Sequence, residues 1–298
     1  MKHAILGAGG VGGLMGACLA RSGASVTMVV RPESVASYPK QLHLESAFGN
    51  FSVPIECSAE VPPADVLWIT VKATQLSPAL SAITKPESVS AMVPLLNGID
   101  HISLLRSKYG SEKVIAATIA VESERVAPGQ IIHRTPFARL NVSSAGRRLL
   151  SETVAALEKI GFECKFYDDE PTLMWSKLVF LAAFALSTTA ADKTTGEILA
   201  DPEWRKLGLG CLREACAVGV AEGAKLDADA VIAGVMKMPG NMRSSMQKDV
   251  AGGKTPELDA IAGPILRGAQ KHGIEIPSTK ELVAAVERRA RYEESLLA

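Results

Sequence analysis

Short apolar runs alternate with mixed polar and apolar stretches through the first half of the chain. The runs that predict buried strands are 1–6, 25–30, 64–71, 90–96 and 114–121. A helical pattern covers 14–22, and strands that alternate with helices favour a parallel, doubly wound α/β sheet. Residues 129–133 and 139–142 predict two short strands around a turn, which we expect to extend this sheet in antiparallel fashion.

The second half of the chain is predicted to be almost wholly helical. A long apolar helix is expected over 173–191. Further helix starts are indicated by cap signals at Asp201-Pro202, Asp227, Thr255-Pro256-Glu257 and Ser278-Thr279-Lys280-Glu281, the last as a capping box. The polar, proline-containing segment 168–171 predicts the boundary. We therefore expect a doubly wound Rossmann domain at 1–168 and an all-helical domain at 169–298.

The segment Gly7-Ala8-Gly9-Gly10-Val11-Gly12 has G-x-G-x-x-G spacing between the first predicted strand and the first helix. In a dinucleotide-binding turn, Gly7 allows the tight bend, Gly9 lets a pyrophosphate approach the backbone, and Gly12 allows close helix–strand contact. The N-terminus of the following helix offers free N–H groups to the phosphates. The motif therefore predicts a dinucleotide cofactor.

Arg31 follows the second predicted strand, where an enzyme that prefers NAD usually has Asp or Glu. A guanidinium there can bind a 2′-phosphate, so NADP(H) is the expected cofactor. The alternative is a solvated arginine at a strand end. Lys72 and Asn97 also follow predicted strands, and the carboxyl ends of parallel strands are where such sheets bind ligands.

Composition narrows the function classes. A formal net charge of zero gives no electrostatic case for a nucleic-acid or membrane partner. We see no uninterrupted apolar run of about 18 residues, the length of a membrane-spanning helix. The five cysteines include no C-x-x-C pair and the five histidines are scattered, so we expect reduced thiols, no metal site and a cytoplasmic location.

Lys177 is the best candidate for a proton donor, because it lies in the apolar stretch Trp175-Ser176-Lys177-Leu178-Val179-Phe180-Leu181. A nicotinamide enzyme needs such a donor near a substrate carbonyl. A lysine among apolar neighbours is either held inside for a function or extends outward to solvent. The pattern alone leaves both open.

Nearly the whole chain resembles the ketopantoate reductase (2-dehydropantoate 2-reductase) family. The matching pieces are 7–12, Arg31, 71–72, 96–98, 175–178, 194–198, 244–249, Glu257 and 272–277. The dinucleotide motif is shared with many families. The specific combination is W-x-K-L, S-S-M-x-x-D, and a glutamate twelve residues after the second serine.

The resemblance implies a role for each matching position. Arg31 and Lys72 would bind NADPH, and Asn97 would lie near the nicotinamide and bind substrate or ribose. Lys177 would be the general acid and stabilise the developing oxyanion. Ser245 would bind the substrate carboxylate, and Glu257 would contact the substrate or the lysine. The implied activity is the reduction of 2-dehydropantoate to pantoate, a step of pantothenate and coenzyme A synthesis. A homodimer is left open by the sequence.

The match fails at two substrate positions. The family has asparagines four and eight residues after the lysine, on the same helix face, and this chain has Leu181 and Ala185 there. Losing buried amides weakens recognition of a substrate hydroxyl. Three hypotheses follow: ketopantoate reductase itself, a relative that reduces a less polar 2-oxo acid, and a non-catalytic NADPH-binding regulator. Thr188, one turn further along, is a candidate replacement.

Overall fold

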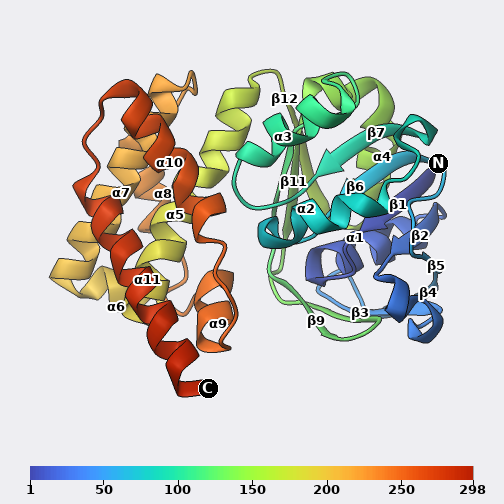
Figure 1. The fold of residues 1–298 in the computed structure, drawn as a ribbon, viewed down its shortest axis with the longest axis horizontal. Coiled ribbons are helices and arrows are strands. Elements are labelled where there is room, and N and C mark those ends of the chain that lie inside the picture. The colour runs from blue at the N-terminus through green and yellow to red at the C-terminus, as the bar shows by residue number, and fades with distance from the viewer. Residues whose placement is uncertain (298) are drawn as a thin grey trace. The chain divides into compact units, whose positions relative to one another are not determined.

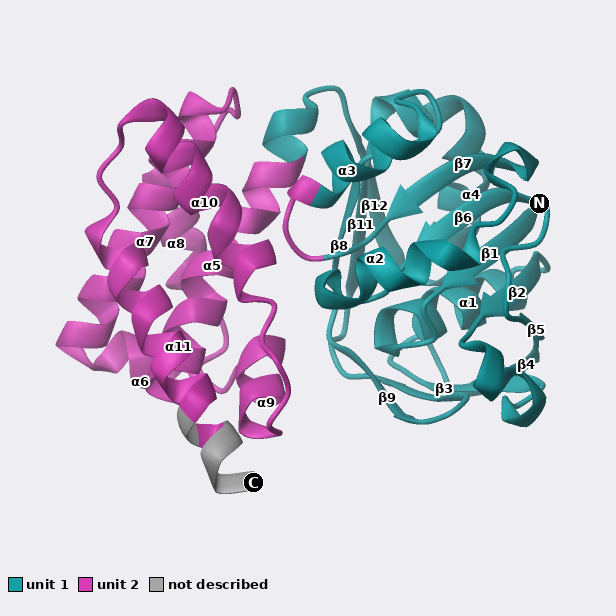
Figure 2. Cartoon of the chain, in the orientation of Figure 1, with its two compact units in different colours: residues 1–96, 101–173 teal, residues 97–100, 174–298 magenta. Residues whose placement is uncertain are grey.

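The structure is a computed structural model that describes residues 1–297, and these divide into two compact units (Figure 2). The first unit comprises residues 1–96 and 101–173. The second comprises 97–100 together with the chain from 174 onward. The first is α/β and the second is all-helical, so the predicted fold class is confirmed. A short excursion, 97–100, thus belongs to the helical unit although it lies early in the sequence.

A five-stranded sheet forms the centre of the first unit (Figure 1). Its order is β5-β2-β1-β6-β7, and every neighbouring pair is parallel. Its strands are β1 (Lys2–Leu6), β2 (Ser25–Val29), β5 (Glu56–Ser58), β6 (Ala64–Ile69) and β7 (Val89–Pro94). The predicted parallel, doubly wound sheet is therefore confirmed, but the predicted run 114–121 forms β8 (Ala117–Ala120) of another sheet, and the edge strand β5 was not predicted. The chain order reverses beside β1, which is where such sheets place ligands.

Alternate side chains of this sheet enter two separate cores. Ile5 and Trp68 pack on one face with residues of α1 (Gly10–Arg21). Leu6 and Leu67 pack on the other face with Leu76 and neighbouring residues of α2 (Leu76–Ala79). Because successive strand residues point to opposite faces, strands covered on both sides read as continuous apolar runs. This is why the sequence pattern identified these strands.

Two smaller sheets complete the unit, in the orders β4-β3-β10-β9 and β12-β11-β8. Their strands are β3 (Gln41–Glu45), β4 (Phe51–Pro54), β8 (Ala117–Ala120), β9 (Ser123–Ala127), β10 (Gln130–His133), β11 (Ala138–Ser143) and β12 (Phe162–Tyr167). The predicted antiparallel extension is wrong, because β10 and β11 belong to different sheets. Each pairs in parallel with one strand, β3 or β12, that the pattern did not reveal.

Short helices connect these strands. The α-helices of this unit not yet given are α3 (Asp100–Tyr109) and α4 (Arg147–Ile160). The 3-10 turns are η1 (Pro32–Ser37), η2 (Ala73–Gln75), η3 (Leu80–Ala82), η4 (Pro86–Ser88) and η5 (Ser144–Gly146). α1 contacts both the central sheet and the β4-β3-β10-β9 sheet. The start of α1 is thereby fixed beside the carboxyl end of β1.

The helical unit is built around α5 (Glu170–Ala191), whose residues from Met174 onward belong to it. Its other helices are α6 (Thr195–Ala200), α7 (Pro202–Ala221), α8 (Ala228–Val235), α9 (Ser245–Ala251), α10 (Leu258–His272) and α11 (Pro277–Leu297). Trp175 and Leu178 lie in its core. Among the described helices, only α5 is long and apolar enough to cross a membrane, and 67% of that apolar window is buried in the protein. That burial is typical of a core helix.

Two of the four predicted helix starts are confirmed. Asp201 and Asp227 cap α7 and α8 by accepting hydrogen bonds from first-turn N–H groups. The other two are wrong in detail. α10 begins at Leu258 with no side-chain cap from Glu257, and α11 begins at Pro277. Instead of a local capping box, Glu214 of α7 accepts hydrogen bonds from the first turn of α11.

Candidate active site

The glycine-rich turn of the first unit has a backbone that requires glycine. Gly7 adopts φ of +111°, which residues with a side chain rarely adopt, and its carbonyl accepts a hydrogen bond from Thr70 Oγ1 at 2.8 Å. A Cβ at Gly12 would lie 2.0 Å from the carbonyl oxygen of Gly7. The turn and the first helix are therefore in direct contact, as the motif predicts.

The start of α1 offers a surface suited to a phosphate group. Gly9 is the N-cap, and no side chain caps the first turn. A Cβ at Gly9 would meet no atom within 4 Å, so the space beside this residue is open. Uncapped N–H groups and the helix dipole favour an anion at this position. These residues fit the pyrophosphate of a dinucleotide.

Arg31 and Lys72 follow β2 and β6 of the same sheet. Arg31 is exposed, and its guanidinium forms no ion pair or hydrogen bond with another residue of the described chain. Lys72 is half-buried at the start of η2. Arg31 is thus a cation available for a ligand phosphate, beside the carboxyl end of the strand that usually contacts the cofactor ribose.

In the helical unit, three of the predicted site residues form a hydrogen-bonded row. Lys177 Nζ of α5 donates to Asn97 Oδ1 at 3.1 Å, and Asn97 Nδ2 donates to Glu257 Oε2 at 3.2 Å. Glu257 is buried, with 7% of its surface exposed. An ammonium can only donate and a carboxylate can only accept, so a single orientation of the Asn97 amide serves both neighbours. The row therefore has a fixed direction.

The segment 97–100 is held against α10, and this positions Asn97. Gly98 adopts φ of +83°, and a Cβ there would lie 2.3 Å from the carbonyl oxygen of Ala260. Arg267 of α10 donates to Asp100 and, at 2.8 Å, to Asp259. The Asn-Gly pair is therefore more than a common turn dipeptide, because its glycine permits the close approach that places the amide beside Lys177.

Burial changes the acidity of Lys177. Desolvation lowers the pKa of its ammonium to about 8, and the negative charge of Glu257 partly opposes this by raising it. Only one of the three ammonium N–H groups is used by Asn97, so two remain for a substrate oxygen. A donor with a pKa near 8 loses its proton more readily than an exposed lysine, which suits general acid catalysis near neutral pH.

Leu181 and Ala185 lie one and two turns after Lys177 on α5. Leu181 is half-buried against the core of the unit, and Ala185 is 1% exposed. Thr188 cannot readily replace a lost amide, because its single O–H donates to the carbonyl of Phe184 at 2.8 Å and its oxygen is hydrogen-bonded to Ser244 Oγ at 2.9 Å. The helix face beyond Lys177 is therefore apolar.

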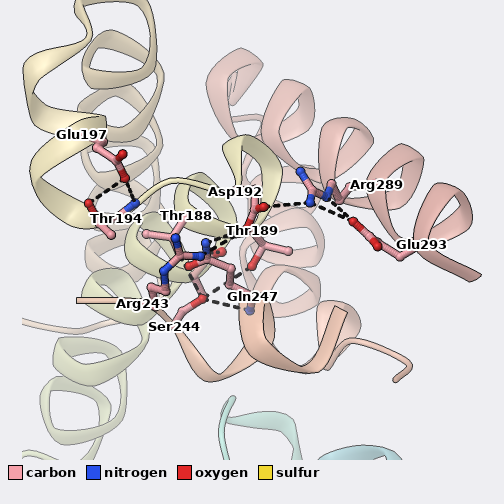
Figure 3. Close-up of polar contacts among 11 residues, drawn as sticks. Thr188, Thr189, Asp192, Thr194, Glu197, Arg243, Ser244, Gln247, Arg289 and Glu293 are labelled. Atoms are coloured by element: carbon pink, nitrogen blue, oxygen red, sulfur yellow. Dashed lines mark hydrogen bonds and ion pairs between the residues drawn. The ribbon is translucent and has the colours of Figure 1, made fainter. Parts of the chain in front are cut away.

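The two adjacent serines at the start of α9 have different roles. Ser244 is 1% exposed and is the N-cap, because its Oγ accepts from Gln247 N at 3.1 Å. Figure 3 shows the hydroxyls of Thr188 and Thr189 turned toward it. Ser245 is the first residue of α9 and is exposed, and it takes no part in the hydrogen bonds of Ser244. Ser245 is therefore the serine that a ligand can reach.

Asp192 connects α9 and α11 in this region, a role that no sequence motif indicated. It is the non-glycine residue with positive φ, 51°, among the described residues. Its carboxylate accepts from Gln247 of α9 at 2.9 Å and from Arg289 of α11 at 2.9 Å (Figure 3). Burial alone would raise its pKa, but these bonds and the charges of Arg289 and Arg243 hold it below the usual value. The one signal in the sequence is that a charged residue directly follows the long apolar helix α5.

Substituting the two serines separately tests the division of roles. Ser244→Ala is expected to lower the free energy of unfolding by about 1 kcal/mol, because α9 loses its N-cap. Ser245→Ala is expected to leave stability unchanged but to weaken binding of a carboxylate ligand about tenfold. Urea denaturation and ligand titration of both variants measure this. Equal stability losses with unchanged ligand affinity would remove Ser245 from the site.

The described residues contain no group of three or more His, Cys, Asp or Glu side chains placed to hold a metal ion.

Comparisons with known proteins match both units. The family model "Ketopantoate reductase PanE/ApbA" matches residues 3–146, and the model of its C-terminal part matches 171–290. A 2-dehydropantoate 2-reductase of Caulobacter vibrioides is 31% identical over 96% of this chain and 98% of its own length.

Solved structures agree with this. A PanE/ApbA family ketopantoate reductase from Ralstonia eutropha JMP134 superposes with a TM-score of 0.86 and is 26% identical. The match covers 99% of this chain and 100% of that one. A D-mandelate dehydrogenase, solved with NADH and anilino(oxo)acetate, has the same fold at a TM-score of 0.86 with 22% identity, and the match covers 98% of this chain and 99% of that one. The chain belongs to the ketopantoate reductase PanE/ApbA family.

Proposed function

We propose that this protein reduces a 2-oxo acid to a 2-hydroxy acid with NADPH, and that 2-dehydropantoate is its substrate. The observation that carries the proposal is the Lys177–Asn97–Glu257 row, in which a buried ammonium with spare donors is held by an amide and a carboxylate. A non-catalytic NADPH-binding protein has no need of such a donor. Membership of a family with named 2-dehydropantoate 2-reductases supports the same substrate.

The cofactor is assigned to the first unit. Gly7, Gly9 and Gly12 shape the turn that would accept the pyrophosphate, Arg31 would bind the 2′-phosphate, and Lys72 would add a second cation. When bound, the dihydronicotinamide supplies a hydride to the substrate ketone. Asn97 is also a candidate to contact the nicotinamide ribose or the substrate, in addition to its bond to Lys177.

The protein's own chemistry is the movement of one proton. As the C2 carbon of the 2-oxo acid gains a hydride, its carbonyl oxygen becomes an alkoxide and takes a proton from Lys177 Nζ. The ammonium stabilises that developing charge before the transfer. Asn97 orients the ammonium through its bond to Nζ, and the carboxylate of Glu257 fixes the Asn97 amide. Ser245 would hold the substrate carboxylate, and the neutral lysine regains its proton from solvent.

A second candidate substrate is a less polar 2-oxo acid. Leu181 and Ala185 make the face beyond Lys177 apolar, and neither can bond a substrate hydroxyl. A fold neighbour is a D-mandelate dehydrogenase bound to anilino(oxo)acetate, an aromatic 2-oxo acid analogue. The candidates differ in what the substrate carries beyond its 2-oxo acid group: 2-dehydropantoate bears a C4 hydroxyl.

A substrate panel tests this proposal. Purified protein, NADPH and separate 2-oxo acids are followed by the loss of the reduced nicotinamide absorbance. The panel contains 2-dehydropantoate, its analogue without the C4 hydroxyl, and benzoylformate. Turnover of 2-dehydropantoate at the highest kcat/KM supports the first candidate. Preference for the analogue or for benzoylformate supports the second, and turnover of none contradicts both.

The pH dependence of the reduction follows from the ionisation of Lys177. The reaction needs the ammonium form, so activity is expected to be full below the pKa of about 8 and to fall as the pH rises through it. Glu257→Gln removes the charge that raises this pKa, so the fall should begin at a lower pH. A plot of log kcat/KM against pH for the parent and for Glu257→Gln measures the pKa in each. An unchanged profile in Glu257→Gln would show that Glu257 does not act on the lysine.

A further inference from the structure

The helical unit contains a cavity of about 40 Å³ among α5, α6, α7 and the segment after α8 (elements labelled in Figure 1). Its lining is almost entirely apolar and includes Phe184 and Met238. None of Lys177, Asn97 and Glu257 lines it. It is therefore a separate feature from the row of residues proposed to carry out the reduction.

One buried polar atom of the lining lacks a partner. Ser187 of α5 is 2% exposed, and its Oγ forms no hydrogen bond with any residue that the structure describes. Buried hydroxyls in native proteins are nearly always hydrogen-bonded, because leaving one unpaired is costly. An unpaired hydroxyl at the wall of a cavity is explained if a ligand atom completes its hydrogen bonding.

Ser187 faces a glycine of α7. A Cβ at Gly208 of α7 would lie 3.0 Å from Ser187 Oγ, which is tighter than an ordinary contact. Any larger residue at 208 would press against the hydroxyl and take up part of the cavity. The glycine has no other evident requirement, since its φ is not positive.

The side chain of Arg205 lies about one helical turn from Gly208 on α7. Arg205 of α7 precedes Gly208 by three residues and also lines the cavity. It is exposed, and its side chain forms no ion pair with another residue within 1–297. Its stem can cover the apolar lining while the guanidinium stays at the solvent side. The cavity thus combines an apolar interior, a free hydroxyl inside and a free cation at its solvent side.

We propose that this cavity binds a short aliphatic carboxylate with an oxygen function at its far end, such as a four-carbon hydroxy acid. The carboxylate pairs with Arg205, the carbon chain contacts Phe184 and Met238, and the terminal oxygen bonds to Ser187. The interior of about 40 Å³ accepts three to four groups of about 10–15 Å³ each, which suits the short carbon chain and its terminal oxygen, while the carboxylate stays outside at Arg205. Met238 adds a flexible side chain that can adapt to the ligand.

The test uses the whole protein with ¹³C-labelled methionine methyl groups and no cofactor. 4-Hydroxybutanoate is titrated in, and the Met238 signal, identified with Met238→Leu, is followed by NMR. Met15 and Met28 of the first unit are internal references. We expect a saturable shift at Met238 with a Kd of about 1 mM, as suits so small a ligand. Butanoate, which lacks the terminal oxygen, should bind about fivefold more weakly.

Variants separate the two contacts. Ser187→Ala should abolish the difference between 4-hydroxybutanoate and butanoate, and Arg205→Gln should weaken both about tenfold. Gly208→Val should fill the cavity and prevent the shift, whereas Asn97→Ala should leave it intact. No shift at Met238 up to about 50 mM, well above the expected Kd, would overturn the proposal. So would unchanged binding in Gly208→Val, or a shift that Asn97→Ala removes, since the ligand would then occupy the proposed catalytic site.

Discussion

Replacing Lys177 by alanine is expected to lower kcat for reduction of a 2-oxo acid by about 10³-fold while leaving NADPH affinity within about twofold. The variant lacks both the proton donor and the cation that stabilises the developing alkoxide. Of the residues proposed to bind the cofactor, Asn97 is hydrogen-bonded to Lys177, and the others belong to the first unit. Stopped-flow or steady-state loss of NADPH absorbance gives kcat, and fluorescence titration gives the affinity.

Lys206→Ala is a matched control, because Lys206 is an exposed lysine of α7 in the same unit. It should retain full activity. Circular dichroism and thermal unfolding of both variants check the fold. A Lys177→Ala enzyme that keeps more than about a tenth of the parent rate would show that another group supplies the proton.

Replacing Arg31 by alanine is expected to weaken NADPH binding by about 10- to 100-fold and NADH binding by less than about threefold. The two cofactors differ in the 2′-phosphate, and a guanidinium bonded to that phosphate contributes only to NADPH. Arg31 is exposed after β2 and has no ion-pair partner among the residues that the structure covers, so its loss disturbs no internal contact. Titration of each cofactor against the variant provides the measurement.

Arg148→Ala, which removes an exposed arginine of α4 in the same unit, serves as the control for net charge. Its NADPH affinity should match that of the parent at fixed ionic strength. If Arg31→Ala weakens NADPH and NADH equally, the guanidinium makes no contact with a 2′-phosphate and the assigned cofactor preference is wrong.

Four strands of the central sheet could be predicted from the sequence because they are covered on both faces, whereas the edge strand β5 has no fully buried residue and was missed. Ile5 and Leu6 point to opposite sides yet are both buried, so each such strand appears as an unbroken apolar run. β3 has alternating exposed and buried residues, and only Phe162 of β12 is buried, so neither strand forms an unbroken apolar run. With both missed, the partners of β10 and β11 could not be assigned correctly.

The candidate site was predictable as a set of residues but not as a geometry. The sequence indicated Lys177, Asn97 and Glu257, and the resemblance gave each a role, but no pattern in the chain shows an amide bridging an ammonium to a carboxylate. That bridge depends on Gly98 lying against Ala260, a contact between residues more than 150 positions apart. Asp192 is a similar case, since its partners come from two later helices.

The central claim is that this protein transfers hydride from NADPH to C2 of a 2-oxo acid. Reaction with NADPH carrying deuterium at both positions of nicotinamide C4, followed by mass spectrometry and NMR of the product, tests it most directly. We predict a 2-hydroxy acid with one deuterium, located at C2, formed in equal amount to the NADP⁺ released. A product without deuterium at C2, or no product from any acid of the panel, would contradict the claim.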